Sequence, residues 1–236
     1  MQLNEKTAEF YDDDATLYDE RRFTTLAGRK NHASQIELIE SLLPADTGRT
    51  VEVGSGTGRF TRLISQRTED YLIVDVSRQM LASANRSVPI TQPLMGDATN
   101  LPLKTQSIDT LVCLNVLNHV PAWEKALTEF ARVLQPGGNL LVNFNNVRSP
   151  YFLPGMIVNR RKRAFRADVF SHWQTWNAFC TALRQAGLSI SDSRGHLQIP
   201  NRTPDPVVRL GVKMDHFLRN RPQFAPAPIL LATKNT

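Results

Sequence analysis

Short apolar runs alternate with segments of helical character through the middle of the chain. The runs at 50–53, 71–76, 108–116 and 139–144 predict buried strands, and a further strand is predicted to end within 90–97. Helices are predicted between them at 59–66, 77–85 and 122–134. Strands that alternate with helices in this way are typical of a parallel sheet covered on both faces.

The two ends of the chain follow other patterns. An acidic segment of helical character opens the chain, and apolar residues at helical spacing predict a helix over 31–44. After residue 144 the alternation stops, and Pro150, Pro154 and Gly155 predict an irregular insertion. A helix over 172–186, an alternating strand over 188–195 and an apolar strand over 227–234 follow.

A glycine-rich turn follows the first predicted strand. Gly54, Gly56 and Gly58 occupy every second position, where glycine permits a tight turn and lets backbone N–H groups approach a ligand. A dinucleotide-binding turn has the spacing G-x-G-x-x-G, but its two registers here place Arg59 or Thr61 at the third glycine. The turn therefore disfavours NAD and FAD as ligands.

Four ordered motifs around this turn resemble those of the class I S-adenosylmethionine-dependent methyltransferases. They are the acid-x-G-x-G-x-G turn beginning at Glu52, "GDATNLPL" at 96–103, "SIDTLVCLNVLNHV" at 107–120 and "ARVLQPGGNLLV" at 131–142. Together they cover about residues 48–145. The resemblance implies a Rossmann-like α/β fold with a seven-stranded sheet and helices on both faces. Strand seven, formed by 227–234, would be antiparallel and pair with 188–195.

The resemblance also implies S-adenosylmethionine as the cofactor. Asp75, 21 residues after Gly54, would accept hydrogen bonds from the ribose hydroxyls, a role that NAD would use equally. Asp97 would bond the adenine amino group, and Arg22 the methionine carboxylate, beneath a lid containing Tyr11 and Tyr18. The full set assigned to the cofactor is Tyr18, Arg22, Glu52, Gly54, Ser55, Gly56, Asp75, Val76, Met80, Asp97, Ala98 and Asn115.

Several of these residues also suit purely structural roles. Glu52 suits a carboxylate bonded to neighbouring N–H groups, and Asp97 suits an ordinary turn residue. Tyr18 and Arg22 suit exposed positions on a helix. The motifs alone leave both readings open at each position.

Methyl transfer from a sulfonium needs the acceptor and the methyl group held in line with water excluded, and the cofactor brings the reactive group. His119, just after the fourth predicted strand, is the best candidate for a general base, although it also suits packing on the cofactor or the next helix. Asn118 replaces the first histidine of a family His-His pair, which leaves the chemistry on the substrate side open. Ile108 and Gln135 also depart from the family pattern, with less consequence.

Charge is divided unevenly along the chain. The net charge is +6, but residues 1–147 carry 14 Lys/Arg against 18 Asp/Glu, whereas residues 148–236 carry 14 against 4. This asymmetry predicts either a solvated basic surface or contact with an anionic partner. The segment 151–166 is apolar and then basic, and favours a lid over an anionic substrate through Arg160, Arg161 and Arg163. A membrane-surface contact toward a lipid-like substrate and a solvated loop are the alternatives.

These patterns predict one methyltransferase domain over 1–236. It comprises an N-terminal helical lid at 1–47, a cofactor-binding core at 48–145, an insertion at 146–170, and a C-terminal helix with strands six and seven at 171–236. The predicted activity is methyl transfer to a small metabolite, with the acceptor atom and the oligomeric state left open. The alternatives are RNA methylation by the basic C-terminal third, which lacks a recognisable nucleic-acid-binding module, and a non-catalytic cofactor-binding partner or sensor.

Other functional classes find little support in the sequence. The first residues lack the pattern of a signal peptide, and no apolar window approaches the ~20 residues of a membrane span, so we expect a cytoplasmic protein. Cys113 and Cys180 have no metal-type spacing. The aspartates at 12–14 favour a solvated helix start over a metal site, and Trp173 and Trp176 favour core packing over a substrate platform.

Overall fold

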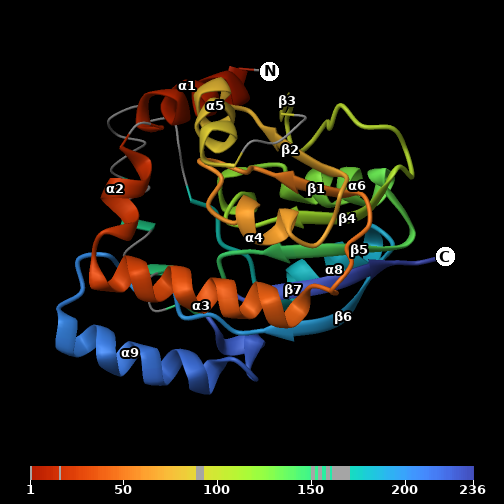
Figure 1. Ribbon diagram of the computed structural model, residues 1–236. Coiled ribbons are helices and arrows are strands. Elements are labelled where there is room, and N and C mark those ends of the chain that lie inside the picture. Colours follow the sequence, from red (N-terminus) through yellow and green to blue (C-terminus); the bar gives the residue numbers. More distant parts are fainter. Residues whose placement is uncertain are drawn as a thin grey trace.

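The structure of the protein, a computed structural model, describes residues 2–15, 17–88, 93–149, 152–153, 156–157, 160 and 171–236. Within these residues a seven-stranded sheet lies at the centre, with helices on both faces (Figure 1). The sheet order is β3-β2-β1-β4-β5-β7-β6. The strands are β1 (Thr50–Val53), β2 (Tyr71–Asp75), β3 (Pro93–Met95), β4 (Ile108–Cys113), β5 (Leu134–Asn143), β6 (Leu188–Arg194) and β7 (Ile229–Lys234).

Strand direction confirms the predicted architecture. Strand β1 lies between β2 and β4 and is parallel to both, with Val51 opposite Leu72 on one side and Leu111 on the other. Strand β7 is antiparallel to both β5 and β6. The strand order reverses between β1 and β4, and ligands of open α/β sheets bind outside the carboxyl ends of the strands at such a point. The fold therefore directs attention to the residues after β1 and β4.

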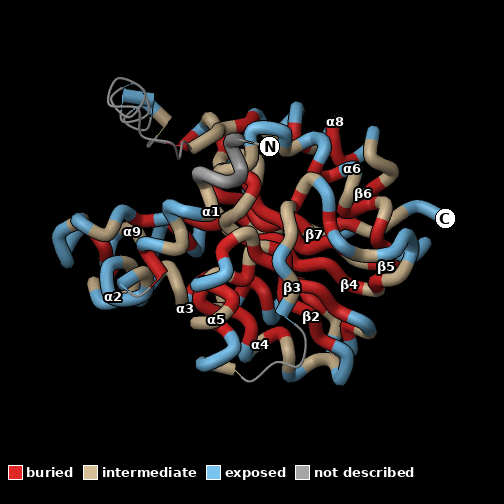
Figure 2. Tube along the Cα trace, turned by 90° about the horizontal axis from the view of Figure 1, so that it is seen from above, coloured by how far each residue is buried: buried red, intermediate tan, exposed pale blue. Residues whose placement is uncertain are grey.

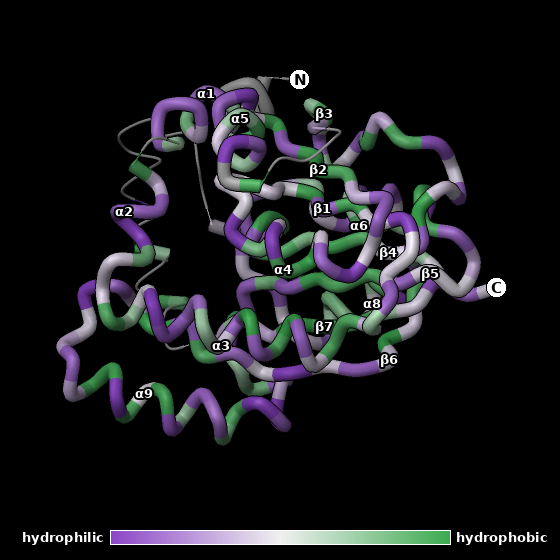
Figure 3. The backbone as a smooth tube through the Cα atoms, in the orientation of Figure 1, coloured by the Kyte–Doolittle hydropathy of each residue, from purple (hydrophilic) through white to green (hydrophobic). Residues whose placement is uncertain are grey.

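Two apolar layers cover the sheet because successive strand residues point to opposite faces. In β2, Leu72 and Val74 belong to the layer under α6 (Trp123–Val133) and α8 (Trp176–Gln185). Tyr71 and Ile73 belong to the layer under α3 (Leu26–Leu42), α4 (Thr61–Ser65) and α5 (Arg78–Ser87). All four side chains are buried, and Figure 2 shows the buried strands at the centre of the molecule. Figure 3 shows the corresponding concentration of hydrophobic positions along the strands.

Local capping explains where two helices differ from the sequence prediction. Helix α3 starts before residue 31, at Leu26, because Oγ1 of Thr25 accepts a hydrogen bond from the Gly28 backbone N at 3.0 Å. Helix α8 starts at Trp176 rather than 172, since Thr175 caps it. The preceding Gln174 is instead extended, and its backbone N donates to the Asn145 carbonyl at 2.8 Å.

The remaining helices lie at one side of the sheet. They are α1 (Gln2–Asp14), α2 (Tyr18–Phe23) and α9 (Asp205–Leu218), and α9 runs beside α3 (Figure 1). A small buried cluster of Ala27, Leu197, Ile199 and Val208 joins α3 to α9 and to the segment after β6. None of the described helices combines the length and apolar character needed to cross a bilayer. Of the predicted basic lid, Arg161 and Arg163 lie outside the described residues.

Candidate active site

The glycine turn after β1 holds backbone conformations that other residues rarely adopt. Gly54 and Gly56 have φ angles of +73° and +55°. A Cβ atom on Gly54 would lie 2.1 Å from Cγ2 of Val116, so packing closes this position, whereas a Cβ on Gly56 would meet nothing within 4 Å. Gly56 therefore presents bare backbone to an open space, as expected of a turn that approaches a ligand.

That space is a cavity at the carboxyl edge of the sheet, which we call the first cavity. It is lined by eleven of the twelve residues that the sequence assigns to a cofactor, all but Arg22. Tyr11, Arg59 and His119 also line it. The structure thus brings together residues from the glycine turn, the ends of β2 and β4, the loop after β3 and the N-terminal helices.

Glu52 is a buried carboxylate at the floor of the first cavity. Thr61 Oγ1 and the Tyr71 hydroxyl both donate hydrogen bonds to its Oε2, each at 2.6 Å. No described residue donates to Oε1. Burial raises the pKa of Glu52 to about 7, although the two hydrogen bonds oppose the rise. Glu52 therefore combines a structural role with one oxygen left for a ligand.

Asp75 ties the end of β2 to the glycine turn. Its Oδ2 accepts a hydrogen bond from the Gly56 backbone N, and its Oδ1 one from the Ser77 backbone N, each at 2.9 Å. Burial raises the pKa of this carboxyl, and the backbone hydrogen bonds counteract that effect. Because an ionised carboxylate offers about four lone-pair sites, each oxygen retains capacity for a ligand hydroxyl.

Asp97 follows β3 and Asn115 follows β4, and both line the first cavity. Asp97 Oδ1 accepts hydrogen bonds from the backbone N of Thr99 at 2.8 Å and from its Oγ1 at 3.0 Å, so it does stabilise a turn. Asn115 has a φ of +63°, a left-handed conformation that asparagine tolerates better than most residues. A reciprocal pair of hydrogen bonds with the Asn143 side chain, at 2.7 and 2.9 Å, fixes it at the end of β4.

Two aspartates of the N-terminal helices contact the core of the site. Asp12 Oδ1 accepts hydrogen bonds from Ser77 Oγ at 2.5 Å and from the Gln79 backbone N at 3.0 Å, at the start of α5. Asp19 Oδ1 accepts a hydrogen bond from Thr57 Oγ1 in the glycine turn at 2.8 Å. Helices α1 and α2 are thus joined to the core by Asp12, for which a solvated helix start was predicted, and by Asp19, which no sequence pattern singled out.

Arg22 lies away from the first cavity, in contrast to the other predicted cofactor residues. Its guanidinium pairs with Asp14 at 3.3 Å and lies 3.9 Å from the centre of the Tyr18 ring. Asp14 is buried and also pairs with Arg21 at 2.7 Å, so it does not belong to a solvated helix start. Among the described residues, no group of three or more His, Cys, Asp or Glu side chains is placed to hold a metal ion.

A second cavity, of about 450 Å³, adjoins the first. Tyr18, Arg59, Asn115 and His119 line both cavities and so mark their junction. The His119 ring lies 6.0 Å from the Tyr11 ring, centre to centre, and its Nε2 is 2.9 Å from Asn118 Nδ2. The second cavity is therefore placed to hold a reaction partner beside a ligand of the first.

The two tryptophans at or just before the start of α8, Trp173 and Trp176, lie in different surroundings. Trp176 packs against Phe144 of the core, with ring centres 6.3 Å apart. Trp173 lines the second cavity instead of the core. Arg59 was not predicted to be a site residue, because the predicted helix over 59–66 included it. The observed helix α4 begins only at Thr61 and leaves Arg59 in the turn.

Comparison with known proteins places the glycine turn in a recognised domain. Residues 51–142 match the family model described as a methyltransferase domain. An uncharacterized methyltransferase of Mycobacterium tuberculosis is 37% identical over 110 residues, which make up 46% of this chain and 44% of that protein. Over this segment the chain is similar to the class I S-adenosylmethionine-dependent methyltransferases. The chain thus spans less than half the length of that mycobacterial relative.

Two further likenesses extend the comparison. A demethylmenaquinone methyltransferase of Renibacterium salmoninarum is 29% identical to this chain over 138 residues, 58% of each chain. A solved structure from Thermotoga maritima, an S-adenosylmethionine-dependent methyltransferase described as a possible histamine N-methyltransferase, superposes with a TM-score of 0.71. It is 22% identical and covers 97% of this chain and 99% of its own. That likeness supports the fold.

S-adenosylmethionine is the cofactor of this family, and the first cavity suits its chemistry. Oε1 of Glu52 and the remaining lone pairs of Asp75 accept donors, and the open side of Gly56 admits a ligand to the backbone. A pyrophosphate group offers no hydrogen-bond donor to Glu52, Asp75 or Asp97, which all line this cavity. The residues of the first cavity therefore fit a sulfonium nucleoside better than a dinucleotide.

Proposed function

We propose that this protein transfers a methyl group from S-adenosylmethionine to a small metabolite by in-line displacement. One observation carries the proposal: Glu52, Asp75 and Asp97 line one cavity together with a glycine turn whose middle glycine faces open space. A ligand with an ammonium group, two ribose hydroxyls and an exocyclic amine offers a donor to each carboxylate.

In this proposal each part of the first cavity has a role. Glu52 and the turn at Gly54–Gly56 receive the methionine end, and Asp75 receives the ribose. Asp97 and Ala98 receive the adenine, with Ser55, Val76 and Met80 as further contacts. Tyr18 closes the cavity from α2. Arg22 is left out of this set because it pairs with Asp14.

The second cavity supports a small molecule as the methyl acceptor. It shares its junction residues with the first cavity, so an acceptor there would lie next to the methyl donor. When bound, S-adenosylmethionine supplies an electrophilic methyl group. The chain supplies alignment and exclusion of water, and His119 at the junction is placed to accept a proton from the acceptor. The Renibacterium relative, named for demethylmenaquinone, is consistent with a small acceptor.

The proposed domain organisation follows from the same contacts. We propose a single domain in which 1–47 forms a helical lid and 48–145 forms the cofactor-binding core. Asp12 and Asp19 join the lid to the core. We further propose an insertion at 146–170 and a C-terminal part at 171–236. Ser149, before the insertion's undescribed residues, and Trp173 and His196 of the C-terminal part line the second cavity.

Isothermal titration calorimetry with S-adenosylmethionine, S-adenosylhomocysteine and NAD tests the proposal. We expect the first two to bind and NAD not to bind. Asp75→Asn should weaken S-adenosylhomocysteine binding about tenfold or more, because hydrogen bonds to a charged group contribute about 1.5–3 kcal/mol. Asp205→Asn, at the exposed start of α9, is the matched control and should leave binding unchanged. Retention of NAD without binding of S-adenosylmethionine would refute the proposal.

A second measurement separates an enzyme from a sensor. Release of S-adenosylhomocysteine is followed while the protein, with S-adenosylmethionine, is offered a panel of phenols, carboxylic acids and amines. Turnover of one acceptor class supports the enzyme. Tight cofactor binding with no turnover of any class would favour the non-catalytic alternative.

A further inference from the structure

The second cavity is lined by basic and neutral polar side chains. Arg22, Arg59 and His196 line it, and none of its described lining residues is Asp or Glu. Asp14 and Asp215 pair with Arg22 and His196 from outside the lining, which leaves Arg59 without an ion-pair partner among the described residues. Most of its other polar groups are amides and hydroxyls, including those of Asn31, Asn145 and Ser149. A cavity of this composition favours ligands with negative charge and disfavours cations.

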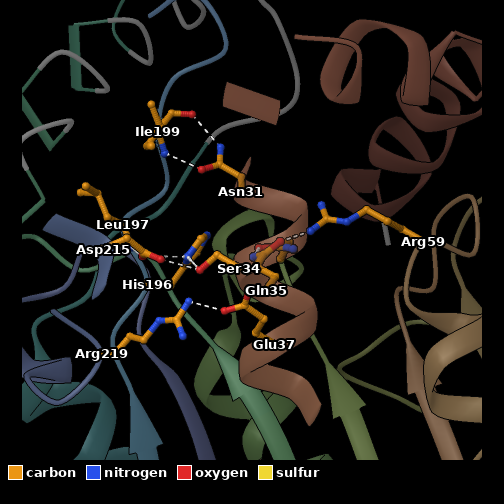
Figure 4. Close-up of polar contacts among 11 residues, drawn as sticks. Asn31, Ser34, Gln35, Glu37, Arg59, His196, Leu197, Ile199, Asp215 and Arg219 are labelled. Atoms are coloured by element: carbon orange, nitrogen blue, oxygen red, sulfur yellow. Dashed lines mark hydrogen bonds and ion pairs between the residues drawn. The ribbon is translucent and has the colours of Figure 1, made fainter. Parts of the chain in front are cut away.

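His196 is the most distinctive group in this cavity, and three distant segments build its surroundings (Figure 4). His196 follows β6, Asp215 belongs to α9, and Ser34 belongs to α3. Oδ1 of Asp215 lies 3.2 Å from His196 Nδ1 and accepts a hydrogen bond from the Leu197 backbone N at 2.6 Å. Ser34 Oγ donates to Oδ2 of Asp215 at 2.5 Å and lies 3.3 Å from His196 Nδ1.

These contacts determine which nitrogen of His196 faces a ligand. Burial acts to raise the pKa of Asp215, but the hydrogen bond and charge of His196, with the bonds from Leu197 and Ser34, lower it overall. An ionised Asp215 accepts a hydrogen bond from Nδ1, so Nε2 is the nitrogen left for a ligand.

Nε2 of His196 is left without a partner by the protein. The ring is 1% exposed, and Nε2 has no hydrogen-bond partner among the described residues. Buried polar atoms are normally paired, so an unpaired one in the wall of a cavity indicates a ligand donor. Asp215 orients the ring in the way that a carboxylate orients a functional histidine. A hydroxyl group satisfies this nitrogen, because a hydroxyl both donates and accepts hydrogen bonds.

Arg59 supplies the complementary positive charge at the junction. Its guanidinium donates to His32 Nδ1 at 3.1 Å and to Gln35 Oε1, and it covers the rings of Phe23 and Phe60. No carboxylate of the described residues lies within ion-pair distance of it. Burial lowers its pKa to about 10, which reflects a cation that neighbouring acids compensate only in part. An anionic ligand would supply that compensation.

We propose that the second cavity binds the methyl acceptor and that this acceptor is a small hydroxylated acid. Its negative group pairs with Arg59, and one of its hydroxyl groups forms a hydrogen bond with Nε2 of His196. Arg22, already paired with Asp14, adds weaker attraction at the same wall. The inference rests on the proposed function, because it assumes that the first cavity holds the methyl donor.

Calorimetry on the full chain saturated with S-adenosylhomocysteine tests the charge preference. The probes are 3,4-dihydroxybenzoate, neutral catechol and cationic 3,4-dihydroxybenzylamine, which suit the aromatic walls at Tyr18 and Trp173. We expect the acid to bind at least tenfold more tightly than catechol, and the amine most weakly. Arg59→Gln should remove the preference for the acid and leave catechol binding unchanged. Arg209→Gln, on the exposed surface of α9, is the control.

A second comparison tests the role of His196. The wild-type protein should bind 3,4-dihydroxybenzoate several-fold more tightly than benzoate, which lacks the hydroxyl donors. His196→Phe keeps a ring but has no ring nitrogen, and should make the two affinities equal. Asp215→Asn should reduce the difference, because the ring loses its orienting carboxylate. The wild-type comparison decides the point alone if a variant does not fold.

The outcomes separate this inference from the proposed function. If S-adenosylhomocysteine does not bind, the proposed function fails and the inference fails with it. If S-adenosylhomocysteine binds but the acid binds no better than catechol or the amine, or does not bind, only the inference is overturned. Equal affinities for 3,4-dihydroxybenzoate and benzoate in the wild type overturn the role of His196. If Arg59→Gln weakens S-adenosylhomocysteine and spares the acid, Arg59 serves the cofactor carboxylate instead.

Discussion

Alanine at position 54 would place a Cβ atom 2.1 Å from Cγ2 of Val116, in a backbone conformation with φ of +73°. The left-handed conformation costs an L-residue about 1–2 kcal/mol. Forcing a methyl group into a packed position costs about 1–3 kcal/mol more. We therefore expect Gly54→Ala to lower the free energy of unfolding by about 2–5 kcal/mol.

Gly56→Ala provides the matched comparison in the same turn. Its φ of +55° carries a similar conformational cost of about 1–2 kcal/mol, but its Cβ would meet nothing within 4 Å. The new methyl group would stand in the first cavity, where the proposed function places the cofactor. Gly56→Ala should thus weaken S-adenosylhomocysteine binding by a free energy larger than its loss in free energy of unfolding.

Urea unfolding and calorimetry on the two variants provide the assay. Gly54→Ala should show the lower urea midpoint, and Gly56→Ala the weaker ligand binding. Val116→Ala removes the atoms that the new Cβ would strike, so in a double-mutant cycle it should recover about 1–3 kcal/mol of the Gly54→Ala loss. Equal destabilisation of the two single variants, with no recovery in the double variant, would refute the packing argument.

Three further predictions address other parts of the site. Burial raises the pKa of Glu52 from 4.5 to about 7, so the folded state binds this proton more tightly than the unfolded state does. The free energy of unfolding should therefore fall by about 3 kcal/mol as pH rises from 4 to 8. Urea unfolding of Glu52→Gln at the same pH values should show no such fall. His119→Gln should lower kcat about 100-fold or more and leave the affinity for S-adenosylhomocysteine unchanged. An unchanged kcat would exclude His119 as the general base. Asp12→Ala should destabilise the start of α5 by about 1 kcal/mol and speed amide hydrogen exchange in α1. Unchanged amide hydrogen exchange in α1 would show that Asp12 does not hold α1 to the core.

Most residues of the first cavity could be predicted from the sequence because they directly follow strands. Glu52 and the glycines adjoin β1, Asp75 ends β2, and Asp97 follows β3, so local patterns place them at one sheet edge. The carboxyl ends of parallel strands meet at that edge whatever the rest of the fold does.

The residues of the second cavity could not be predicted from the sequence in the same way. Ser34 and Asp215 are separated by 181 positions, and only the packing of α9 beside α3 brings them together. His196 lies in an irregular segment whose position no periodicity predicts. Asn143, which fixes Asn115, likewise depends on the pairing of β4 with β5 rather than on its neighbours in sequence.

The fastening of the N-terminal helices limits the share of molecules in which they part from the core. Asp12 and Asp19 each hold α1 or α2 to the core through side-chain hydrogen bonds at separate points. At about 1 kcal/mol for each anchored point, these two tethers alone favour the closed arrangement about thirtyfold. With no other contact counted, an arrangement in which both helices have parted while the sheet stays intact would be populated at about 3%.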